Sequence, residues 1–154
     1  MAKQLGTKVI AENRRARHDY ELLDRFECGI VLTGTEVKSL RDGRVTLAQA
    51  YADVRGMEVW LAGAEIQQYA QGNTANHEPV RDRKLLLHRS EISSLLGKVR
   101  EKGLTLVPTK LYFKDGRVKI EIALARGKEK GDKRRDVMAR EAKRDMDRAL
   151  KGRR

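Results

Sequence analysis

Residues 105–124, TLVPTKLYFKDGRVKIEIAL, predict a β-hairpin. Asp115 and Gly116 make up a dipeptide that is typical of a two-residue hairpin turn. After this turn every second residue is apolar, namely Val118, Ile120, Ile122 and Leu124. Such alternation is expected of a strand that buries one face and exposes the other. This hairpin is the clearest structural element in the sequence.

Two segments before the hairpin also read as strands. Residues 19–32 are rich in strand formers, and Gly29 is a candidate bend or bulge. Four apolar side chains of this segment are expected to share one face: Leu22, Phe26, Ile30 and Leu32. Residues 50–69 read as two strands joined at Arg55 and Gly56. Strands are therefore expected at both ends of residues 19–124.

Two short helices are predicted between these strands. The first has Thr35 as a suitable N-cap and Gly43 as its stop signal. The second follows Ser90, where apolar residues recur at helical spacing, and ends at Gly103.

The other segments of the first 125 residues are polar. Residues 1–17 are expected to form an arm or loop, and residues 70–84 a polar loop. With strands at both ends and short helices between them, the pattern suggests a mainly β fold. We expect a small closed barrel with short peripheral helices.

Positive charge is concentrated at the C-terminus. The chain has 154 residues and a net charge of +12, and residues 126–154 carry 13 Lys/Arg against 6 Asp/Glu, which is +7. These residues are expected to form a basic tail that is disordered when free, with a helix over Arg135–Leu150 when bound. Residues 1–125 are expected to form the folded domain. Excess charge of this size favours a polyanionic partner.

Several classes of function have no support in the sequence. No catalytic group, phosphate-binding glycine loop or cofactor site is recognisable. Cys28 is the only cysteine, and the three histidines lie far apart, so we expect no metal site. No stretch of about 18 apolar residues is present, so no membrane partner is expected. No small-molecule substrate is expected either. The chain is expected to be located in the cytoplasm.

Two basic clusters are candidates for contact with nucleic acid. The first contains Arg14, Arg15, Arg17 and His18, and the second contains Arg81, Arg83 and Lys84. The sequence has only seven aromatic residues, and six of them fall in expected strands. Stacking of single strands is therefore less favoured than recognition of a folded RNA by its shape and backbone.

Five strings together resemble the SsrA-binding protein (small protein B) family, the partners of transfer-messenger RNA in bacterial ribosome rescue. These strings are NRRARHDYE (13–21), FECGIVLTGTEVKSLRDG (26–43), RDRKLLLHRSEI (81–92), GLTLVPTKLYFKDGRVKIEIALARGK (103–128) and GDKR (131–134). The resemblance implies an OB-like closed β-barrel that binds the tRNA-like domain of transfer-messenger RNA. It also implies delivery to the decoding centre of a stalled 70S ribosome, where the tail becomes helical in the empty mRNA channel.

The resemblance also assigns residues. Asn13 and Glu27 would contact RNA, with Leu86 supporting the same surface and the first basic cluster flanking Asn13. A carboxylate such as Glu27 can accept hydrogen bonds from a base amino group or a ribose hydroxyl. The tail residues expected to meet the ribosome are Lys128, Lys130, Asp132, Lys133, Arg134, Arg135, Arg140, Lys143 and Arg144. Glu129 interrupts the basic run that precedes the DKR motif in the family.

The expected function is that of a non-enzymatic RNA-binding adaptor. The alternative is a ribosome-associated structural RNA-binding protein with a basic extension. A nuclease is a more distant alternative, because it would need clustered carboxylates or a histidine paired with a general acid.

Overall fold

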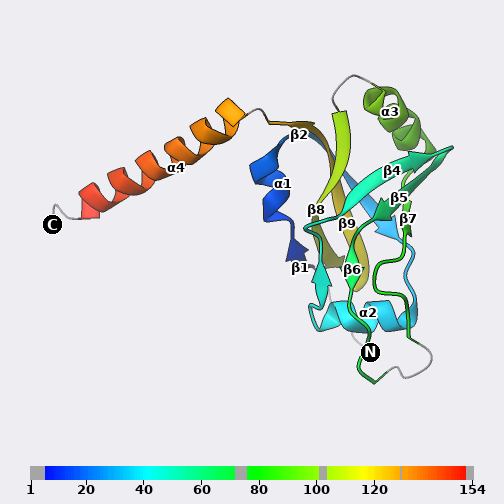
Figure 1. The fold of residues 1–154 in the computed structure, drawn as a ribbon. Coiled ribbons are helices and arrows are strands. Elements are labelled where there is room, and N and C mark those ends of the chain that lie inside the picture. Colours follow the sequence, from blue (N-terminus) through cyan, green and yellow to red (C-terminus); the bar gives the residue numbers. More distant parts are fainter. Residues whose placement is uncertain (1–5, 72–75, 101–103, 129, 152–154) are drawn as a thin grey trace.

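The computed structural model describes residues 6–71, 76–100, 104–128 and 130–151 (Figure 1). Its strands are β1 (Thr7–Glu12), β2 (Tyr20–Ile30), β3 (Val45–Thr46), β4 (Tyr51–Arg55), β5 (Glu58–Ala62), β6 (Glu65–Ile66), β7 (Arg83–Leu86), β8 (Leu104–Lys114) and β9 (Arg117–Gly127). Its helices are α1 (Arg14–Asp19), α2 (Gly34–Arg41), α3 (Arg89–Val99) and α4 (Lys130–Lys151). The fold is therefore mainly β with peripheral helices, as the sequence predicted.

Seven strands form one sheet in the order β1-β8-β4-β5-β7-β2-β9, and β9 also pairs with β8. The sheet thus closes on itself, with β1 added along β8. We call it a ring of strands rather than a true barrel, because β4 and β8 are joined by the single residue pair Ala52–Leu106. In Figure 1, α2 lies at one end of this ring and α3 at the other.

The hairpin predicted at residues 105–124 is confirmed as β8 and β9. These strands pair from Leu104–Arg126 to Lys114–Arg117. Asp115 and Gly116 have φ angles of 50° and 81°. A two-residue hairpin turn whose central residues both have positive φ matches the twist of the flanking strands.

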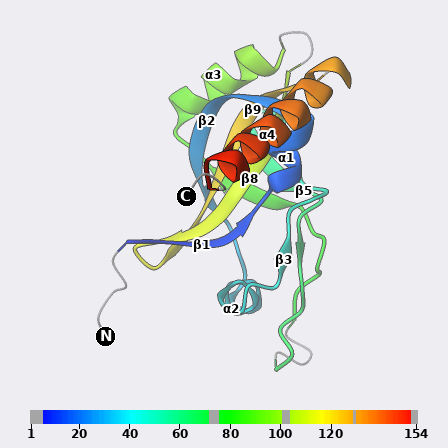
Figure 2. The same ribbon diagram turned by 90° about the vertical axis from the view of Figure 1, so that its left-hand side faces the viewer.

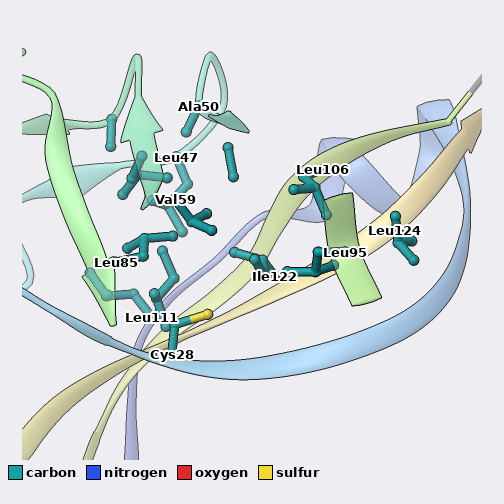
Figure 3. Packing of buried hydrophobic residues seen from close by; sticks show 14 of the residues in the cluster. Cys28, Leu47, Ala50, Val59, Leu85, Leu95, Leu106, Leu111, Ile122 and Leu124 are labelled. Carbon is teal, nitrogen blue, oxygen red and sulfur yellow. The ribbon is translucent and has the colours of Figure 1, made fainter. Parts of the chain in front are cut away.

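One apolar cluster fills the interior of the ring. Figure 3 shows Cys28, Leu111 and Ile122, from β2, β8 and β9, gathered with Val59 and Leu85 from the other strands. Each of these side chains is at most 2% exposed. The interior of the ring is therefore filled by side chains.

The expected single apolar face of residues 19–32 is wrong for Leu22. The register of β2 against β9 shifts between Leu22 and Arg25, and not at Gly29. Phe26 packs against the main core, whereas Leu22 joins a small cluster with Ala16 on the outside of the ring. A bulge adds one residue and so moves the following side chains to the other face.

Both predicted short helices are present, with different starting points. The N-cap of α2 is Thr33 rather than Thr35, and Glu36 completes its capping box. The N-cap of α3 is His88, and its helical residues end at Val99. The expected stop at Gly103 lies outside the described residues.

The prediction of an arm or loop over residues 1–17 is wrong where the structure describes it. β1 pairs with β8, with Lys8 opposite Phe113. α1 follows and buries Ala16 against Val107 and Ala125. The sequence of this region has no sustained period and so gave no signal for a strand. The strand forms because β8 of the neighbouring hairpin supplies its pairing partner.

α4 is longer than the helix expected over residues 135–150. It runs away from the ring of strands in Figure 1, and Figure 2 views the molecule from the side toward which it points. Its described side chains, those of Met138 and residues 140–149, are exposed. A helix with so few apolar side chains has little surface to bury against the ring.

Candidate nucleic-acid interface

The outside of strands β2, β9 and β8 carries Glu27, one of the expected RNA-binding residues, among several other polar side chains. Successive side chains of a strand point to opposite faces. Cys28 and Ile120, which are paired across β2 and β9, point inward and are fully buried. Glu27 and its cross-strand neighbour Glu121 therefore point outward. We call this surface the outer face, and it also includes Arg25, Lys110, Tyr112, Lys114 and Lys119.

Glu27 is the centre of a hydrogen-bond network on the outer face. It accepts a hydrogen bond from the hydroxyl of Tyr112, and Lys114 Nζ lies 3.1 and 3.3 Å from its two carboxylate oxygens. The hydrogen bond from Tyr112, followed by that from Lys114, lowers the pKa of Glu27. The Glu27 side chain is still 41% exposed. It therefore stays charged at neutral pH and keeps acceptor capacity for a ligand.

Tyr112 is the buried partner in this network. Its burial, together with the hydrogen bond to Glu27, raises the pKa of its hydroxyl. The phenol thus remains a hydrogen-bond donor throughout the physiological pH range. Because Tyr112 is only 5% exposed, its hydroxyl holds the Glu27 carboxylate in one orientation.

Glu27 and Leu86 line the same cleft, of about 330 Å³. Gly29 of β2 is paired with Leu86 of β7, which brings the two strands together there. A Cβ on Gly29 would lie 3.2 Å from Leu86 Cβ, so glycine lets the strands approach this closely. Leu86 is 52% exposed, an unusual position for a large apolar side chain. The two residues that the resemblance assigned to one surface therefore meet in the structure.

Lys119 and His88 line the same cleft and were missed by sequence reasoning. The alternation along residues 117–124 predicts that Lys119 points outward. It does not say which strand lies beside Lys119, and the pairing of β9 with β2 decides that. His88 is brought there by the start of α3, next to β7.

Asn13 is buried and acts within the protein. Its Oδ1 accepts a hydrogen bond from the backbone N–H of Ala16 at 3.2 Å, which caps α1. Its Nδ2 donates to the carbonyls of Pro108 at 3.0 Å and Leu47 at 3.3 Å. These three bonds use both ends of the amide. In this structure Asn13 therefore positions α1.

α1 presents the first basic cluster to solvent. Arg14, Arg15 and His18 are exposed, and Arg15 and His18 lie 3.4 and 2.9 Å from carboxylate oxygens of Asp19. A second cleft, of about 220 Å³, lies beside this helix and is lined by Arg15, Tyr20 and Tyr51, among others. Ala16 of α1 packs on the same side of the strands as Leu22. α1 therefore extends the outer face.

The expectation that Arg83 lies on an RNA-binding surface is wrong. Its side chain is fully buried, and Nε lies 2.5 Å from Oε2 of the equally buried Glu36. The remaining guanidinium nitrogens donate to the carbonyls of Ala64, Glu78, Pro79 and Arg81. The arginine thus ties the loop before β7 to α2.

Arg81 and Lys84, from the same cluster, have different surroundings. Both Nε and Nη2 of Arg81 donate to Glu36, at 3.1 and 2.6 Å. The positive charge of Arg81 is therefore largely neutralised by Glu36. Lys84 lies on the outside of β7, two residues from Leu86, with 42% of its side chain exposed. Of the second basic cluster, Lys84 alone is both exposed and close to the cleft.

Glu36 is the carboxylate that joins these two arginines. Burial would raise its pKa, but hydrogen bonds from Arg81, the backbone N–H of Thr33 and Arg83 outweigh burial and lower the pKa to about 2. Glu36 is therefore a permanent negative charge in the folded protein. By neutralising Arg81 and Arg83, Glu36 explains why the second basic cluster does not form a positively charged surface.

The structure describes only part of the expected ribosome-binding tail. Lys128 belongs to the folded part, because its N–H donates to Asp19 and its Nζ to the carbonyl of Arg17. Arg140, Lys143 and Arg144 are exposed along α4. The side chains of Lys130 and residues 132–135, which include Asp132, Lys133, Arg134 and Arg135, lie outside the described residues. So does Glu129.

Residues 6–71, 76–100, 104–128 and 130–151 contain no helix that is long and apolar enough to span a bilayer. Nor do these described residues bring together three or more His, Cys, Asp or Glu side chains able to hold a metal ion.

Comparison with known proteins gives matches along nearly the whole chain. The model of the family described as SmpB protein matches residues 10–152. An SsrA-binding protein of Thermobifida fusca is 59% identical and covers 99% of this chain and 95% of its own length. One of Acidothermus cellulolyticus is 58% identical, with 97% and 94% covered.

A solved structure is also similar. Its description reads "tmRNA-SmpB: a journey to the center of the bacterial ribosome". It is 53% identical with a TM-score of 0.66, and the match covers 78% of this chain and 85% of that one.

Proposed function

The chain belongs to the SmpB protein family, and we propose that it binds transfer-messenger RNA and delivers it to stalled ribosomes for trans-translation. Its relatives are SsrA-binding proteins, and its structural neighbour comes from work on transfer-messenger RNA and the ribosome. The observation that carries the proposal for this chain is the cleft of the outer face. There two carboxylates, Glu27 and Glu91, converge with an apolar side chain and a lysine.

The ligand of the outer face is the tRNA-like domain. Glu27 accepts hydrogen bonds from base amino groups or ribose hydroxyls, Leu86 packs against a base or sugar, and Lys119 attracts phosphate. Arg14, Arg15, His18 and Lys84 add phosphate contacts from either side. Asn13 acts indirectly by holding α1. Arg83 has no contact with RNA, and Arg81 contributes little because Glu36 holds it.

Residues 126–154 supply the ribosome-sensing tail. A helix of 22 residues, such as α4, is about 33 Å long at 1.5 Å per residue. Its exposed Arg140, Lys143 and Arg144 suit a channel lined by RNA phosphates. Asp132, Lys133 and Arg134 act near the decoding centre, and Arg135 and Lys130 add positive charge to the same part of the tail. The protein works as a cytoplasmic adaptor and not as an enzyme.

The test is to identify the RNA that co-purifies with the full-length protein. The wild type should enrich transfer-messenger RNA over bulk ribosomal RNA. The double variant Glu27→Ala/Leu86→Ala should lose this enrichment, whereas a matched double variant of exposed residues away from the cleft, Glu65→Ala/Val80→Ala, should keep it. Enrichment of ribosomal RNA alone would favour the alternative, a ribosome-associated structural protein. Metal-dependent RNA cleavage by the purified protein would favour a nuclease.

A further inference from the structure

The carboxylate of Glu27 keeps one acceptor site that its neighbours leave free. A carboxylate offers about four lone-pair sites on its two oxygens. Oε2 accepts from the hydroxyl of Tyr112 and from Lys114 Nζ at 3.3 Å, whereas of the described groups only Lys114, at 3.1 Å, donates to Oε1. Glu91, the other carboxylate of the cleft, accepts from the N–H of His88 at 3.2 Å in the capping box of α3. Oε1 of Glu27 therefore has room for one further donor.

A single hydroxyl donor fits this free acceptor better than the edge of a base does. Guanine presents two parallel N–H donors and would need a free site on both oxygens, but Tyr112 and Lys114 take up Oε2. A lone amino group of adenine or cytosine fits by count, but bases that are read in this way also stack on flat side chains. Among the described residues that line the cleft, His88 carries the only ring, and Leu86 and Leu87 supply aliphatic surface. Aliphatic surface suits the carbon face of a sugar.

Lys119 lies where the phosphate of the same nucleotide would be. Gly29 is paired with Leu86 on one side and with Lys119 on the other. Glu27 precedes Gly29 by two residues on the same face, so Glu27 and Lys119 are diagonal neighbours, about 7–8 Å apart at their backbones. Lys119 is half-buried and forms no ion pair with a described carboxylate. A carboxylate and an ammonium at this spacing can meet the hydroxyl and the phosphate of one nucleotide.

We infer that Glu27 is a specificity-determining residue that reads the 2′-hydroxyl of one ribose, and that Tyr112 and Lys114 are positioning residues that leave only Oε1 free for it. The hydroxyl donates to Oε1, the sugar packs against Leu86, and the phosphate faces Lys119. The cleft thus distinguishes RNA from DNA, because DNA has no donor at this position. The inference rests on the proposed function for its ligand and adds the chemical group that is read.

The first test maps where a 2′-deoxynucleotide weakens binding of the tRNA-like domain to the full-length protein. Transcripts with one deoxynucleotide at varied positions are bound by the protein, and the bound and unbound fractions are compared position by position. For the wild type, one position in contact with the cleft should lose about 10- to 100-fold in affinity, as for a hydrogen bond to a charged group. For Glu27→Ala the loss at that position should disappear, while losses at other positions remain.

The second test uses Tyr112→Phe, which removes the hydroxyl and keeps the buried ring. The deoxy effect at the same position should shrink to a few-fold, because the carboxylate is no longer held. The hydroxyl of Tyr112 lowers the pKa of Glu27, so its removal should also move the fall in RNA affinity in acid to a higher pH. Tyr69→Phe is the matched control, because it removes a hydroxyl that binds Gln71 outside the cleft, and both readouts should stay at wild-type values. Circular dichroism checks that each variant is folded.

Three outcomes would count against these ideas in different ways. Equal deoxy effects at every position in the wild type and in folded Glu27→Ala would overturn the inference, as would a base substitution, in place of a deoxy substitution, whose effect disappears in Glu27→Ala. Wild-type behaviour of Tyr112→Phe in both readouts would overturn its positioning role. Failure of the wild type to bind the all-ribose transcript would instead overturn the proposed function.

Discussion

Arg83 and Glu36, which are 47 residues apart in the sequence, form an ion pair with an Nε–Oε2 distance of 2.5 Å although neither side chain is exposed. The pair joins the start of β7 to α2, on the far side of β7 from the exposed Lys84 and Leu86. Because Leu86 lines the RNA cleft, the ion pair supports the strand on which part of the site is built.

Replacing Arg83 with methionine should strongly destabilise the protein. The substitution leaves Glu36 as a buried charge with Arg81 as its one remaining cation and the N–H of Thr33 as its other donor, and such losses typically cost about 3–5 kcal/mol. Denaturant unfolding of Arg83→Met measures this cost. Arg55→Met is the control, because Arg55 pairs with Asp53 and Asp82 on the surface and should lose no more than about 1 kcal/mol. Equal stability of the two variants would contradict a structural role for Arg83.

The stability of the protein should fall in acid through Glu36. Its pKa in the folded state is about 2, below the ordinary value of 4.5, so the folded state binds this proton less tightly than the unfolded state. The stabilisation is complete above about pH 5 and is lost as the pH falls toward 2. A difference of this size is worth about 3 kcal/mol.

The free energy of unfolding measured between pH 7 and pH 3 tests this expectation. Glu36→Gln should be less stable than the wild type at pH 7, but its free energy of unfolding should fall less steeply as the pH is lowered. Parallel curves for the two proteins would assign the acid sensitivity to other carboxylates.

Glu27→Gln should weaken binding of the tRNA-like domain less than Glu27→Ala. Glutamine keeps one acceptor oxygen in reach of the Tyr112 hydroxyl and of the RNA, whereas alanine removes both. The alanine variant should lose about 1–3 kcal/mol of binding free energy, as for a polar group left unpaired. Titration of labelled RNA gives the values. If both folded variants bind like the wild type, Glu27 is not part of the interface.

Asn13→Ala should lower stability and weaken RNA binding through α1. It removes the helix cap, which is worth about 1 kcal/mol, and leaves the carbonyls of Leu47 and Pro108 without their donor. Asn13→Asp separates the two roles, because aspartate keeps the cap and loses only the donor. If Asn13→Ala leaves thermal unfolding unchanged but abolishes RNA binding, the result would support direct contact between Asn13 and RNA.

The point at which the tail is removed should decide whether stability suffers. Deleting residues 129–154 takes away α4 and no described contact of β9, so the melting temperature should stay within about 2 °C. Deleting residues 126–154 also removes the pairs Glu21–Arg126 and Tyr20–Gly127 and should lower it clearly. Both truncations should abolish ribosome rescue in a tagging assay. Full tagging by either would refute the proposed role of the tail.

The sequence by itself determined the elements whose signals are local. The β8–β9 hairpin follows from Asp115, Gly116 and the alternation after them, and α3 follows from its apolar spacing. These patterns can be read without the rest of the chain, because each reports which side of one strand or helix is buried. The assignment of Glu27 and Leu86 to one surface came from resemblance, since neither lies in a distinctive pattern of its own.

Only the tertiary structure decided which polar groups are free to bind. Arg83 and Lys84 are adjacent basic residues, yet one is buried against Glu36 and the other is exposed beside Leu86. Asn13 became a cap and β1 became a strand because β8 lies beside them. The physical reason is the same in each case: burial and hydrogen bonding depend on partners tens of residues away, brought close by the pairing of strands around the ring.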